Sequence, residues 1–144
     1  MSALPPGYRL SLDLQDADPV AAHAFLTRSY WSPGIPLETV RAAMAHSICC
    51  TVHHQGGQVA MARVISDKAT FAYLADVYVL EVHQGRGLAQ AMLAALHDHP
   101  ELQGLRRWLL FTRDAHSLYA KFGWQGLNHP ERAMLRDNPD IYRA

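Results

Sequence analysis

The sequence predicts a mixed α/β domain, and three observations support this fold class. Strand-like runs separated by turn residues fill the middle of the chain, which is typical of antiparallel hairpins. Further along, a strand-like run passes through two glycines into a helix-like run and then a further strand, as in a parallel crossover. The 144 residues, 49% hydrophobic and 18% charged, suit one folded domain over 1–144. We therefore expect a mixed, mostly antiparallel central sheet with helices on both faces.

The first elements follow from periodicity and from a capping pair. An alternating run predicts a strand over 8–14. Asp18 followed by Pro19 is typical of the start of a helix, which we expect to end near Arg28. Apolar residues at helical spacing then predict a second helix over 37–46.

Three strands come next. The runs 47–54 and 58–66 are strand-like, and the Gln-Gly-Gly segment between them predicts a hairpin turn. The run 70–80 is almost wholly apolar. Such a run is typical of a central strand that is covered on both faces.

The second half predicts the remaining elements. The chain becomes helical from Gly87, and 106–112 predicts a fifth strand. A short helix is expected over 115–122, closed by Gly123, because glycine is common just past a helix end. The segment 124–128 predicts the start of a last strand. The expected order is β-α-α-β-β-β-α-β-α-β.

Composition excludes several classes of function. Thirteen basic and thirteen acidic residues give a net charge of +0, so we expect no nucleic-acid partner. Cys49 and Cys50 are adjacent, so a disulfide between them is not expected, and neither they nor His53 and His54 complete a metal site. The chain starts without signal-peptide features and has no membrane-spanning run. We expect a cytoplasmic protein without a metal or a membrane partner.

Two glycines at the strand-to-helix junction point to an anion. The first turn of a helix has N–H groups without intrahelical partners, and Gly85 and Gly87 carry no side chain that would keep a diphosphate away. A tight turn explains the same glycines without any ligand. The P-loop is excluded because Gly-Lys-Ser/Thr is absent, and the dinucleotide fingerprint is excluded because its third glycine position is Gln90.

A third phosphate-binding pattern fits. The spacing Gln84-x-x-Gly87-x-Ala89 resembles the Arg/Gln-x-x-Gly-x-Gly/Ala motif of the GCN5-related N-acetyltransferases (GNAT superfamily). The run 74–80 resembles the family's fourth strand, and 118–124 resembles its Leu-Tyr-x-x-x-Gly-Phe segment. The resemblance covers nearly the whole chain. The family's asparagine before the tyrosine helix is missing, which motivates the alternative of a catalytically inactive CoA-binding or regulatory module.

The resemblance implies an acetyl-CoA-dependent N-acetyltransferase that moves the acetyl group directly to a primary amine of a small molecule or peptide. It implies that Tyr119 protonates the departing thiolate, although a tyrosine at this position also suits a core. Backbone N–H groups around Val77 and Val79 would stabilise the oxyanion. The resemblance further implies a diphosphate site made of Gln84, Gly85, Arg86, Gly87, Leu88 and Ala89.

The resemblance implies that the loop between the first two helices lies on the acceptor side, and the residues themselves suggest a candidate base. Asp76 is the only carboxylate within an apolar strand run, so it is either a base acting through water or an acceptor of structural hydrogen bonds. Tyr30 and Trp31, in the loop between the first two helices, either line the acceptor pocket or pack as a lid on the core. The acceptor's identity and the oligomeric state, including a homodimer, are left open.

Overall fold

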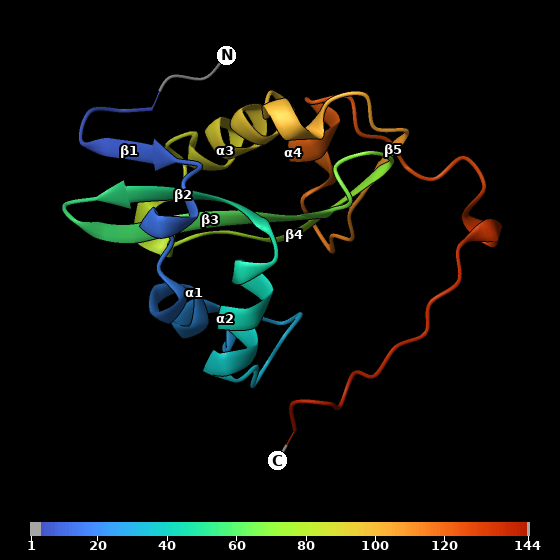
Figure 1. The fold of residues 1–144 in the computed structure, drawn as a ribbon, viewed down its shortest axis with the longest axis horizontal. Helices are drawn as coiled ribbons and strands as arrows, with labels where there is room; N and C mark the ends of the chain where they lie inside the picture. Colours follow the sequence, from blue (N-terminus) through green and yellow to red (C-terminus); the bar gives the residue numbers. More distant parts are fainter. Residues whose placement is uncertain (1–3, 144) are drawn as a thin grey trace.

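The computed structural model describes residues 4–143, so residues 1–3 and 144 of the expected domain lie outside the described part. One five-stranded sheet has the order β1-β2-β3-β4-β5, antiparallel except for the parallel pair β4–β5. Figure 1 shows α3 and α4 on one side of this sheet and α1 and α2 on the other. The strands are β1 (Tyr8–Ser11), β2 (Ile48–His54), β3 (Gly57–Ser66), β4 (Phe71–Val79) and β5 (Arg107–Leu109). The helices are α1 (Pro19–Leu26), α2 (Leu37–Ala45), α3 (Leu88–His97) and α4 (His116–Ala120). The predicted fold class is confirmed.

Local chemistry explains where the first elements begin and turn. The Asp18 side chain accepts hydrogen bonds from the N–H groups of Val20 and Ala21, so it caps α1 as predicted. Between β2 and β3, Gln55 and Gly56 have φ of 51° and 81°. Positive φ at both central residues is the requirement of a two-residue type I′ hairpin, whose twist matches that of the strands.

The core has one apolar cluster on each face of the sheet. The larger cluster packs α3 against β2, β3 and β4, and the smaller one packs α1 and α2 against the other face. Cys50 belongs to the first cluster and Cys49 to the second, as expected for neighbours on a strand. Burial raises the pKa of Cys49 to about 11 and of Cys50 to about 12, so both thiols stay protonated and unreactive.

The last predicted strand is not formed within the described residues. Segment 124–128 has no strand, and the chain continues from there as an extended tail (Figure 1). Gly123, at φ 89°, ends α4: its own N–H and that of Trp124 bond to the carbonyls of Ala120 and Tyr119, a Schellman motif. The Trp124 indole then donates to Nε2 of His97 at 3.1 Å. The bond fixes the Trp124 side chain against the end of α3, where its ring also lies 6.0 Å from that of Trp108 on β5, and the backbone beyond it leaves the sheet as the tail.

Two irregularities of β4 open the sheet. Its parallel pairing with β5 stops at Tyr73 and Leu109, after which the two strands part. The register with β3 shifts between Met61 and Arg63, and Asp76, on the bulged side, has φ 53°. A bulge bends a strand and redirects its side chains. Within residues 4–143, no helix is long and apolar enough to cross a membrane.

Candidate active site

A groove of about 560 Å³ lies where β4 and β5 part. The end of β4 forms one side, α4 and the residues before it form the other, and the start of α3 closes one end. Seven of the eight residues predicted to contact the cofactor line it, namely Val77, Val79, Gln84, Gly85, Gly87, Leu88 and Ala89. The sequence did not single out Asp114, which lines the opposite side.

The glycines of the loop have both a conformational and a spatial role. Gly85 and Gly87 have φ of 77° and 78°, in the left-handed region that favours glycine. Gly87 is the N-cap of α3, and no side chain of the described residues caps this helix. A Cβ added at Gly87 would meet no described atom within 4 Å. The space above the first turn is therefore open, and the N–H groups of that turn can donate hydrogen bonds to an anion.

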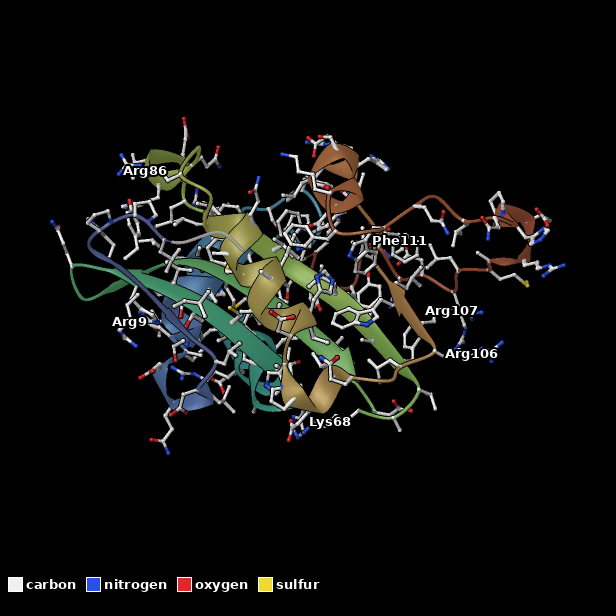
Figure 2. The ribbon with its side chains drawn as sticks, turned by 90° about the horizontal axis from the view of Figure 1, so that it is seen from above. Arg9, Lys68, Arg86, Arg106, Arg107 and Phe111 are labelled. Carbon is white, nitrogen blue, oxygen red and sulfur yellow. The ribbon has the colours of Figure 1, made fainter. Side chains whose placement is uncertain are left out.

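The eighth residue predicted to contact the cofactor, Arg86, is not among those that line the groove. Its Nη1 donates to the hydroxyl of Tyr8 at 3.0 Å, and that hydroxyl also bonds to Nδ1 of His83 at 2.7 Å. Figure 2 shows Arg86 at the outer end of the loop. At the start of the loop, Gln84 donates a hydrogen bond from Nε2 to the Val79 carbonyl at 3.0 Å. These contacts tie the loop to β1 and β4.

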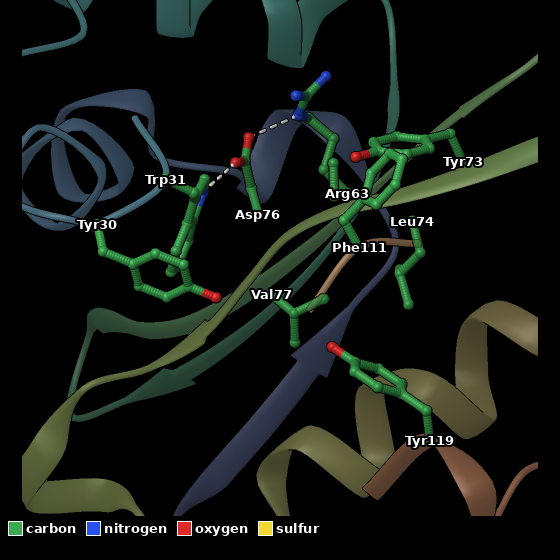
Figure 3. Close-up of a pocket in the computed structure, with 10 residues that line it drawn as sticks. Tyr30, Trp31, Arg63, Tyr73, Leu74, Asp76, Val77, Phe111 and Tyr119 are labelled. Carbon is green, nitrogen blue, oxygen red and sulfur yellow. Dashed lines mark hydrogen bonds and ion pairs between the residues drawn. The ribbon is translucent and has the colours of Figure 1, made fainter. Parts of the chain in front are cut away.

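A second cavity, of about 270 Å³, adjoins the groove. Val77 and Tyr119 line both spaces, so the two meet at these side chains. In Figure 3, Tyr30 and Trp31 stand on one side of the cavity and Tyr73 and Phe111 on the other. Tyr30 and Trp31 thus line a cavity, which is one of the two placements that their sequence position allowed.

Asp76 is held by two donors. Its Oδ2 lies 2.9 Å from Nε of Arg63, and its Oδ1 accepts from Nε1 of Trp31 at 2.9 Å. The Arg63 and Asp76 side chains are each 13% exposed, so this ion pair is largely shielded from water. Arg63 also donates from Nη1 to the Ser47 hydroxyl at 3.1 Å. Asp76 therefore accepts structural hydrogen bonds, one of the two roles that its sequence position left open, and both its oxygens are engaged.

Tyr119 is buried at the junction of the two spaces, with 8% of its surface exposed. Burial raises the pKa of Tyr119 to about 12, and the nearby Tyr30 makes a smaller contribution in the same direction. Figure 3 shows the hydroxyls of both tyrosines directed toward the centre of the cavity. At neutral pH the Tyr119 phenol is therefore protonated and can donate a hydrogen bond into the junction.

Sequence reasoning missed half of the residues that line the second cavity, among them Arg63, Tyr73 and Phe111. Arg63 left a signal, because it is the only charged residue in the strand run 58–66 and a buried charge needs a partner. The sequence held no signal for Phe111, because it lies within the strand predicted over 106–112. The described residues include no group of three His, Cys, Asp or Glu side chains that could hold a metal ion.

Comparisons with known proteins agree with this geometry. The acetyltransferase (GNAT) domain model matches residues 45–126. A Gibberella zeae protein named as a candidate acetyltransferase is 31% identical over 137 residues, which cover 79% of this chain and 76% of that protein. A crystal structure from Xanthomonas campestris pv. campestris, of a candidate GNAT-family acetyltransferase, is 45% identical with a TM-score of 0.92, over 96% of this chain and 99% of that one.

A more distant structure shares the fold. It is a candidate acetyltransferase from Clostridium acetobutylicum solved with acetyl-CoA, 18% identical with a TM-score of 0.64, over 91% of this chain and 94% of that one. The domain match covers more than half of this chain, and the two closer relatives align over most of it. This chain therefore belongs to the GNAT family of acetyltransferases.

Proposed function

We propose that this protein transfers the acetyl group of acetyl-CoA directly to a primary amine of a small molecule or peptide. The observation that carries the proposal is the meeting of two spaces at Val77 and Tyr119. One space suits a long cofactor and the other a small acceptor, so their junction is where a thioester and an amine would come together. Direct transfer needs that proximity and no covalent enzyme intermediate.

The groove has the chemistry that CoA requires. Its open end at the first turn of α3 offers N–H donors and the positive end of the helix dipole to a diphosphate. Beyond that end, β4 lines the groove at Val77 and Val79, whose backbone N–H groups would face the cofactor. The structure solved with acetyl-CoA in the same fold supports this choice of cofactor.

At the junction, Tyr119 would stabilise the departing thiolate. A thiol of this type has a pKa near 8.5, well below the value of about 12 for Tyr119. A hydrogen bond from the phenol is therefore favoured over complete proton transfer. The developing oxyanion would accept from backbone N–H groups near Val77 and Val79, as in other acyl-transfer sites.

The acceptor amine must lose its proton before attack, which costs about 4 kcal/mol at pH 7 for an alkylamine. Asp76 can contribute in one of two ways. Its contacts with Arg63 and Trp31 support a positioning role in which Asp76 fixes one wall of the acceptor cavity. Action as a base through water would require one of those oxygens to be released.

The experiment pairs Tyr119→Phe with Tyr142→Phe, a matched change on the tail. Acetyl transfer from radiolabelled acetyl-CoA is measured on an amine panel, and CoA binding by calorimetry. We expect Tyr119→Phe to lower kcat about a hundredfold with CoA affinity unchanged, while Tyr142→Phe behaves as wild type. CoA binding without turnover on any amine would favour the inactive module. A protein that does not bind CoA would refute both functions.

A further inference from the structure

Aromatic side chains form two facing walls in the smaller cavity. Tyr30 and Trp31, from the loop between α1 and α2, lie with ring centroids 5.1 Å apart, and Tyr73 and Phe111 lie 6.0 Å apart on the opposite side. Figure 3 shows the two pairs separated across the cavity, with Val77 and Tyr119 at its base. The arrangement leaves room for a flat group between the walls.

These rings are unusually accessible for their size. Tyr30 is 51% exposed, Trp31 40% and Phe111 66%. Single exposed apolar residues are common, but three large ones from two separate segments around one cavity mark a surface that binds a partner. Phe111 follows β5, and its largely exposed ring lies 6.0 Å from that of Tyr73. Its packing adds little to the fold, so a bound ligand is the better explanation for its position.

The charged side chains that line the cavity are already paired. Among the described lining residues only Arg63 and Asp76 carry a charge, and they are bound to each other. The described lining residues therefore offer no unpaired charge to a second ionic group. An acceptor with a phosphate, a carboxylate or a second ammonium would lose water there without gaining a partner.

We propose that the acceptor is an arylalkylamine, a primary amine joined by a short chain to a flat apolar ring. This inference rests on the acetyl transfer proposed above and names its substrate class. The ring would lie between the Tyr30–Trp31 and Tyr73–Phe111 walls, with the amine directed to the junction at Tyr119. The size agrees: a cavity of about 150 Å³ holds a benzene ring, and this one is about 270 Å³.

The experiment compares kcat/KM for four amines at saturating acetyl-CoA. Phenylethylamine carries the ring, hexylamine is an apolar amine without a ring, putrescine has a second cation, and β-alanine has an anion. Ring stacking in a protein site is worth about tenfold in affinity, so phenylethylamine should exceed hexylamine by about that factor. Putrescine and β-alanine should be weaker than hexylamine because their second charge has no partner.

Two variants test the walls. Phe111→Leu keeps an apolar side chain but removes the ring, so it should lower kcat/KM for phenylethylamine more than for hexylamine and abolish most of the phenylethylamine preference. Met134→Ala changes a side chain on the tail that is 98% exposed and should affect neither amine.

The outcomes separate the two proposals. Equal rates on all four amines, or a preference for a doubly charged one, would overturn the substrate class and leave acetyl transfer intact. If no amine is acetylated, calorimetry with the CoA-loaded protein decides. Binding of phenylethylamine that Phe111→Leu weakens would support the ring site while refuting transfer. No binding would refute the ring site as well.

Discussion

Gly87→Ala tests whether the loop before α3 binds the diphosphate. Gly87 has φ 78°, so an alanine there adopts a left-handed conformation at a cost of about 1–2 kcal/mol. The new Cβ meets no described atom within 4 Å, so no clash with the protein adds to this strain. It would stand where a diphosphate approaches the first turn. Losing a hydrogen bond to a charged group costs about 1.5–3 kcal/mol, or roughly tenfold to a hundredfold in affinity.

Gly56→Ala is the matched control. Gly56, in the hairpin between β2 and β3, has φ 81° and equally open surroundings. Both variants should therefore lose similar stability, a Tm decrease of roughly 3–8 °C for a chain of this size. Only Gly87→Ala should weaken CoA binding in calorimetry. Equal CoA affinity in the two variants would refute the assignment of the loop and leave the tight turn as the reason for its glycines.

Two further predictions concern Asp76 and His97. If Asp76 positions Trp31, Asp76→Asn keeps an oxygen for the indole and raises KM with kcat little changed, and Trp31→Phe does the same. A general base would instead lose kcat by about a hundredfold or more, along with the acidic limb of the pH–rate profile. Burial lowers the pKa of His97, and Asp98 opposes this with a smaller effect. The folded protein therefore favours the neutral imidazole. The free energy of unfolding decreases as the pH falls below about 6.5, the pKa of histidine in the unfolded chain. Thermal unfolding should show the wild-type Tm falling more between pH 7 and pH 5 than that of His97→Gln, and parallel curves would contradict this.

Much of the fold was predictable because its signals are local. The Asp18-Pro19 cap, the hairpin glycines and the closing glycine of α4 each act within a few residues, and each appears as predicted. The last strand was wrong for a non-local reason. Its first residue, Trp124, is bound to His97 on α3, a contact between residues 27 positions apart that no sequence window shows.

The two sides of the candidate site differ in the same way: one is made of a local segment and the other of residues far apart in the sequence. The cofactor side depends on one continuous segment, Gln84–Ala89. Its two glycines and the start of the helix can be recognised in the sequence, and its role in binding the cofactor stays a prediction. The acceptor side depends on Asp76, Arg63 and Trp31, which come from β4, β3 and a loop 45 residues before Asp76.

The bulge in β4 connects the two sides. Asp76, at φ 53°, occupies a conformation that aspartate tolerates better than most residues. The bulge places Asp76 beside Arg63 and Trp31 in the smaller cavity, while Val77, the next residue, lines both cavities. This irregular pair of residues thus lies where the groove and the smaller cavity meet. A regular β4 would keep its register with β3 and alternate its side chains strictly between the two faces, so Asp76 and Val77 could not both line the smaller cavity.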